Sequence, residues 1–82
     1  MPTVTVLYFA QARDRLGMEA ETLTLPASVD ADTVLGAIRL RHPSHAALID
    51  RCRVAVDHEF VTGSMTLTER SEIALIPPVS GG

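Results

Sequence analysis

The chain has 82 residues, 46% of them hydrophobic and 21% charged, which is typical of one folded domain and leaves no room for an enzyme with a deep cleft of its own. Its formal net charge of −3 argues against a nucleic-acid or anionic-membrane partner, because both require clustered lysine and arginine. No apolar run approaches the roughly 20 residues of a membrane span and no signal peptide is recognisable, so we expect a cytoplasmic location.

The chain opens with a pattern that predicts a β-hairpin. Residues 3–9 are β-branched and aromatic and alternate at their start, which favours a strand. Residues 10–17 contain charged side chains and end on glycine, so a connecting loop is expected there. Residues 21–25 alternate polar and apolar side chains until a proline, which predicts a second strand paired with the first.

One main helix follows the hairpin. Ser28 or Asp30 is a suitable N-cap, and His42-Pro43 ends the helical pattern. A single apolar stripe repeats at i, i+3, i+4 and i+7, formed by Ala31, Val34, Leu35 and Ile38. A short helical turn is expected after Ser44.

The second half of the chain predicts further strands. Residues 53–56 form a third strand, residues 57–59 a tight turn and residues 60–61 a short strand, while Leu67 in the next loop is expected to plug the core. Residues 72–76 form the final strand. The order, ββαβββ or close to it, indicates an α+β fold of the β-grasp (ubiquitin-like) type, with a mixed sheet of four to five strands and one main helix on one face.

The isolated cysteine and the histidines suggest no catalytic or metal site. Cys52 flanks a strand and is expected to be a small buried or half-buried residue, not a nucleophile. His42, His45 and His58 have no ligand partner at metal-binding spacing on one regular element, so all three are expected in loops or on the surface and no metal is assigned.

The C-terminal residues suggest a reactive group. Gly81-Gly82 lack Cβ atoms and present the narrowest cross-section to a partner's channel, which leaves the terminal carboxylate accessible. Pro77-Pro78 hold the chain extended. With Val79 and Ser80 between them, the tail has a stiff base, a flexible tip and a reach of roughly 20 Å. We therefore expect a β-grasp domain at residues 1–76 and an extended reactive tail at residues 77–82.

A docking face is predicted from the alternation of the last strand. If Ile73 and Leu75 meet the helix stripe, Ala74 and Ile76 lie on the open face of the sheet. Phe60 extends that apolar patch, and an uncovered apolar face on a small domain is typical of a partner interface.

These features resemble the molybdopterin synthase small subunit family, the ubiquitin-like sulfur carriers of molybdenum cofactor biosynthesis. The ending Pro-Pro-Val-Ser-Gly-Gly is similar to that family's C-terminal signature, and residues 6–10 and 54–57 resemble its opening and middle strands. The family usually has a Gly-Asp turn before the last strand, where this chain has Arg70-Ser71. A type I turn tolerates most residues, so the local geometry is in question and the fold is not.

The resemblance implies a two-stage chemistry at Gly82. An ATP-dependent, E1-like adenylyltransferase adenylylates its carboxylate, and a sulfur donor protein converts the glycyl adenylate to a thiocarboxylate, a 1-thioglycine. The tail then enters the large subunit of molybdopterin synthase, where the sulfur attacks cyclic pyranopterin monophosphate. By the same resemblance, two large and two small subunits assemble, the catalytic pocket is on the large subunit, and this chain binds no cofactor itself.

Three other functions remain open from the sequence. The chain is also similar to thiamin-type sulfur carriers. A ubiquitin-like protein modifier joins its glycine to protein amines, and amine-linked adducts in cell extract favour that alternative. A β-grasp interaction module without reactivity is the third, and it predicts full function after deletion of Gly81-Gly82.

Overall fold

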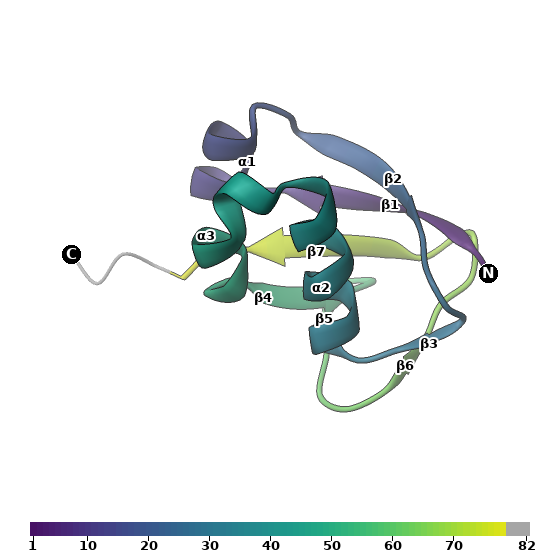
Figure 1. Ribbon diagram of the computed structural model, residues 1–82. Coiled ribbons are helices and arrows are strands. Elements are labelled where there is room, and N and C mark those ends of the chain that lie inside the picture. The colour runs from purple at the N-terminus through teal and green to yellow at the C-terminus, as the bar shows by residue number, and fades with distance from the viewer. Residues whose placement is uncertain (79–82) are drawn as a thin grey trace.

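The computed structural model describes residues 1–78 and shows a mixed sheet with its helices packed on one face (Figure 1). The sheet has five strands in the order β2-β1-β7-β4-β5, in which β1 and β7 are parallel and the other neighbours antiparallel. These strands are β1 (Thr3–Tyr8), β2 (Ala20–Thr24), β4 (Arg53–Val56), β5 (Glu59–Phe60) and β7 (Glu72–Ile76). The predicted α+β, β-grasp architecture is confirmed.

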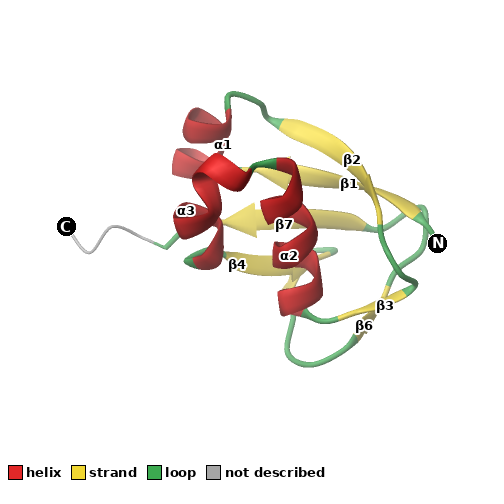
Figure 2. Cartoon of the chain, viewed as in Figure 1, coloured by secondary structure: helices red, strands yellow, loops and turns green. Residues whose placement is uncertain are grey.

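The helices cover the inner face of the sheet (Figure 2). They are α1 (Ala10–Leu16), α2 (Ala31–Arg41) and α3 (Ala46–Asp50), with a 3₁₀ turn, η1 (Pro43–His45), between the last two. Within residues 1–78, no helix has the length and apolar character needed to cross a membrane. Nor does that part of the chain contain a group of three or more His, Cys, Asp or Glu residues able to hold a metal ion.

The main helix α2 forms where its cap and apolar stripe predicted. The Asp30 carboxylate accepts a hydrogen bond from the backbone N–H of Thr33 at 2.8 Å, and the Thr33 hydroxyl also donates to it. These bonds lower the pKa of Asp30 and satisfy a backbone donor left open at the helix start. Val34, Leu35 and Ile38 are buried against the sheet, as the stripe requires.

The loop predicted at residues 10–17 is wrong, because the segment forms helix α1. Its charged residues lie on the exposed side, while Ala12 is buried and Leu16 packs against the core at i+4. Gly17 is the left-handed C-cap, with φ +74° and its N–H donating to the Arg13 carbonyl at 3.0 Å. The glycine that suggested a loop therefore marks the end of a helix.

A small second sheet was not predicted. It pairs β3 (Ser28–Val29) with β6 (Met65–Thr66). Two residues are too few for a periodic pattern, so only the tertiary pairing reveals these strands. Leu67 follows directly and is buried, which confirms its expected place in the core.

The turn before β7 forms without the family's Gly-Asp pair. The N–H of Ser71 donates to the Thr68 carbonyl at 3.0 Å, and the Ser71 hydroxyl accepts from the Thr68 N–H at 2.9 Å. The N–H of Arg70 donates to the Thr68 hydroxyl at 3.2 Å. None of these residues has a positive φ, so no glycine is required.

The hairpin from β4 to β5 turns through two residues, not the three expected. Asp57 and His58 have φ values of +49° and +73°, the left-handed conformation that a type I′ hairpin turn requires. Glu59, predicted in the turn, instead pairs with Val56 in the sheet.

A polar cluster joins the end of α2 to the edge of the sheet. The Glu21 carboxylate accepts from the Tyr8 hydroxyl, lies 2.5 Å from Nε2 of His42 and is 3.1 Å from the Arg41 guanidinium. His42 lies between α2 and η1, a loop position as expected, but its side chain is only 14% exposed and its ring meets the Tyr8 ring edge-on at 6.0 Å. By contrast, His58 is exposed as expected.

This cluster makes a prediction about stability and pH. Burial alone would raise the pKa of Glu21, but hydrogen bonds from Tyr8 and His42 and the charges of His42 and Arg41 lower it below its usual value. We expect Glu21→Gln to destabilise the fold at pH 7 by about 1–3 kcal/mol, because buried hydrogen bonds to a charged acceptor are weakened. A carboxylate with a lowered pKa stabilises fully above its unfolded-state pKa and loses that effect as pH falls through the folded-state pKa.

Urea unfolding from pH 7 down to pH 3 measures this effect. The difference between wild type and Glu21→Gln should shrink in acid, whereas the exposed control Glu19→Gln should match wild type throughout. A difference that stays constant across this range would contradict the assigned role of the Glu21 charge.

Candidate functional site

The parallel pairing of β1 and β7 determines where the candidate site lies. Tyr8 is opposite Leu75, so Phe9, which follows β1, and Ile76, which ends β7, reach the same end of the sheet. Pro77, the first residue after β7, continues the chain at this end of the sheet (Figure 1). Ile73 and Leu75 are fully buried beneath the helices, whereas Ala74 and Ile76 face the open side, as the alternation predicted.

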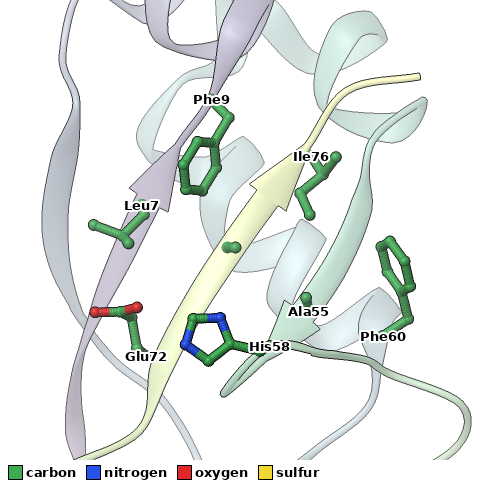
Figure 3. Close-up of a pocket in the computed structure, with 8 residues that line it drawn as sticks. Leu7, Phe9, Ala55, His58, Phe60, Glu72 and Ile76 are labelled. Carbon is green, nitrogen blue, oxygen red and sulfur yellow. The ribbon is translucent and has the colours of Figure 1, made fainter. Parts of the chain in front are cut away.

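A groove of about 210 Å³ runs across this open face (Figure 3). Its floor follows one line of register across four strands, where Leu7 pairs with Ala74, Ala74 with Ala55 and Ala55 with Phe60. Two alanines lie between two larger side chains, so the sheet is hollowed at its centre. Phe60 remains 45% exposed at the margin, although a monomeric domain gains by covering such a ring.

The groove is apolar near the tail and polar at its other end. Phe9, which is 44% exposed, and Ile76 lie at the tail end, whereas Glu72 and His58 lie at the opposite end (Figure 3). Asp57 anchors the polar end, because its N–H donates to the Glu72 carbonyl and its carboxylate accepts from the Glu72 N–H, both at 2.9 Å.

The start of the tail belongs partly to the domain. Pro77 is buried, and Pro78 is exposed. The remaining tail positions of the sequence hypothesis, Val79, Ser80, Gly81 and Gly82, lie outside the described residues.

The structure brings together the three residues predicted as a docking face, since Phe60, Ala74 and Ile76 all line the groove. Sequence reasoning missed Leu7 and Phe9. The sequence does indicate that Leu7 faces away from Val6 and Tyr8, because the three residues alternate in β1. It does not indicate which face of the sheet stays open, since that depends on where the helices pack.

The described residues lack a conventional catalytic cluster. Cys52 is buried, its Sγ donates to the Leu48 carbonyl at 3.3 Å, and burial raises the pKa of its thiol, so it is a poor nucleophile and matches the predicted structural role. Burial and the Glu21 carboxylate likewise raise the pKa of the Tyr8 phenol. What residues 1–78 present is a surface suited to binding.

The chain is similar to proteins that are named sulfur carrier subunits. It is 37% identical over 82 residues to the human molybdopterin synthase sulfur carrier subunit, covering 96% of this chain and 93% of that protein. It is also 38% identical over 88 residues to the subunit of the same name from Mycosarcoma maydis, with 99% and 95% of the two chains covered.

Solved structures share the fold. SAMP1 from Haloferax volcanii superposes with a TM-score of 0.77 at 22% identity, covering 98% of this chain and 99% of that one. A solved complex of subunits 1 and 2 of the molybdopterin-converting factor from Helicobacter pylori contains a chain with the same fold. That chain superposes with a TM-score of 0.68 at 21% identity, covering 98% of this chain and 99% of that one.

The family model for ThiS proteins matches residues 6–82, which is nearly the whole chain. The match includes the groove-lining strands as well as the terminal segment. With relatives above 30% identity over nearly their full length, this protein belongs to the ThiS family of ubiquitin-like domains, together with the molybdopterin synthase sulfur carrier subunits.

Proposed function

We propose that this protein is the sulfur carrier subunit of a molybdopterin synthase. The observation that carries the proposal is the similarity, above 35% identity and over nearly the full length, to two subunits of that name. The apolar groove beside the tail supports it, because a carrier needs a docking surface next to its reactive end.

The proposed chemistry takes place at the Gly82 carboxylate. A carboxylate oxygen attacks the α-phosphorus of ATP on an E1-like adenylyltransferase, releasing pyrophosphate and forming a glycyl adenylate. Sulfide equivalents from a sulfur donor protein then displace AMP, which leaves a thiocarboxylate on Gly82. Adenylylation is needed because AMP is a good leaving group, whereas direct attack of sulfur on the free carboxylate would have to expel an oxide ion.

The thiocarboxylate sulfur then serves as the nucleophile in the large subunit's pocket. The sulfur forms a bond to a side-chain carbon of cyclic pyranopterin monophosphate as that carbon's bond to oxygen breaks, so that a thioester links the two molecules. Water then cleaves the acyl–sulfur bond, which restores the Gly82 carboxylate and leaves the sulfur on the pterin product. This division of labour agrees with a domain whose polar cluster around Glu21 does not line the groove.

The large subunit is the proposed occupant of the groove. The Helicobacter pylori structure is a complex of subunits 1 and 2, and its matching chain has the same fold as this one. We assign Leu7, Phe9, Phe60, Ala74 and Ile76 to the contact, because together they form the apolar part of the groove.

The intact mass of the protein tests the proposal. We would purify the protein from its own host during active molybdenum cofactor synthesis. The thiocarboxylate would be protected by alkylation, and the C-terminal peptide would be sequenced by tandem mass spectrometry. The expected result is a mass gain equal to the exchange of one oxygen for sulfur, located at Gly82. Incubation with the large subunit and cyclic pyranopterin monophosphate should reverse that gain and yield molybdopterin.

The other candidate functions predict different products. Isopeptide linkage of Gly82 to protein lysines would identify a modifier, and sulfur transfer to a thiazole precursor without molybdopterin formation would identify a thiamin-type carrier. Either result, in place of molybdopterin, rejects the proposal.

A further inference from the structure

One edge of the groove carries a positive charge that the apolar surface does not require. Arg53 starts β4 and pairs with Ile76, so it lies beside the tail end of the groove. It shares the open face with Ala55 two residues later, and its guanidinium carbon lies 3.8 Å from the centroid of the Phe60 ring.

This stacking leaves the polar edge of the guanidinium available. A guanidinium centred over an aromatic ring is attracted by the negative face of the ring, but its N–H donors still need hydrogen-bond acceptors. Among residues 1–78, no carboxylate lies within 4.0 Å of the Arg53 guanidinium. Nor does the Arg53 side chain donate a hydrogen bond to any residue in that range. The side chain is thus held in place without a polar partner from the described domain.

A protein that covers the groove has to accommodate this charge. Phe60 is part of the apolar surface, so a partner that packs on the ring also removes water from the guanidinium above it. Desolvating an arginine without an acceptor is costly, whereas a carboxylate placed in the plane of the guanidinium recovers that cost through two parallel hydrogen bonds.

The opposite end of the groove has the opposite sign. Glu72 lies four residues before Ile76 on β7, about 13 Å away along an extended strand. No cation among the described residues forms an ion pair with Glu72. The open face is therefore positive at the Phe60 margin of the groove and negative at its Glu72 end, which distinguishes one docking orientation from the reverse.

We propose that Arg53, stacked on Phe60, binds an aspartate or glutamate side chain of the large synthase subunit and so selects the orientation in which the tail enters that subunit. The inference rests on the proposed function for its partner. It adds a specificity-determining contact that an apolar patch alone does not supply, because apolar burial is non-directional.

Binding measurements with the purified large subunit test this contact. Isothermal titration calorimetry would compare wild type with Arg53→Met, Arg53→Lys and Arg53→Glu, and with Arg70→Glu as the control. Arg70 is exposed, lies in the turn before β7, away from the Phe60 margin, and undergoes the same change of charge. Thermal unfolding of each variant verifies that the exposed substitutions leave the domain folded.

We expect Arg53→Glu to weaken binding by about 100-fold or more, because two carboxylates then face each other in a desolvated contact. Arg53→Met and Arg53→Lys should each lose roughly 10-fold, since methionine lacks the charge and lysine lacks the planar fork. The Arg70→Glu control should stay within about twofold of wild type. Replacing one acidic residue of the large subunit with a basic one should restore the binding of Arg53→Glu, and it should not improve the binding of the other variants.

Two results would overturn the inference. Wild-type affinity for Arg53→Met shows that the stack only shields Phe60. Equal losses for Arg53→Glu and Arg70→Glu show that the effect is one of net charge. In both cases wild type still binds the large subunit, so the proposed function survives; failure of wild type to bind rejects the proposed function and the inference together.

Discussion

Adding one alanine after Gly82 is expected to abolish thiocarboxylate formation completely, while thermal unfolding stays nearly unchanged. Adenylylation requires the Gly82 carboxylate itself, and an added residue converts it to an unreactive amide. The last residue of a chain generally contributes little to the folding free energy, so the domain should melt as wild type does. The measurement is the intact mass after incubation with the activating enzyme, ATP and the sulfur donor, with the extra alanine verified as still attached.

Two further variants sharpen this experiment. Deletion of Gly82 leaves a free carboxylate on Gly81, one residue short, and should lose sulfur transfer in the large subunit because the nucleophile no longer reaches its target. Met1→Ala alters the other end of the chain and should behave as wild type. Normal molybdopterin production by the extended variant would exclude Gly82 as the sulfur-bearing group.

The second large effect is expected in docking. Ile76→Asp should weaken binding to the large subunit by about 2–4 kcal/mol, or roughly 30- to 1,000-fold, because a carboxylate would be desolvated in the apolar part of the groove. Phe60→Asp should act in the same direction. Both side chains face the open side of the sheet and are partly or largely exposed, so the domain should remain folded. Calorimetric affinity and circular dichroism provide the two readouts.

Matched substitutions separate the groove from the rest of the domain. Thr22→Asp adds the same charge at an exposed position of β2 outside the groove and should leave binding within about twofold, whereas Ile73→Asp places it in the fully buried core and should unfold the protein. If Ile76→Asp and Phe60→Asp bind as tightly as Thr22→Asp, the groove is not the contact surface.

The amino-acid pattern predicted most of the regular structure because the longer elements carry strong periodic signals. The helix α2 follows from its cap at Asp30 and its apolar stripe, and β7 follows from the alternation that places Ile73 inside and Ile76 outside. Helix α1 was missed because its buried side is short and its N-terminus has no side-chain cap. The two-residue strands β3 and β6 have no internal pattern at all.

The candidate site divides in the same way. The sequence by itself determined that Phe60, Ala74 and Ile76 were candidates for one apolar patch, and it predicts the reactive tail, since the alternation in β7 and the terminal residues are local features. Only the tertiary structure decided that Leu7 and Phe9 complete the groove and that Arg53 stacks on Phe60, because these contacts join residues from separate strands. The parallel pairing of β1 with β7 brings Phe9 and Ile76 to the same end of the sheet. Such pairing depends on how the helices cover one face, which no local pattern specifies.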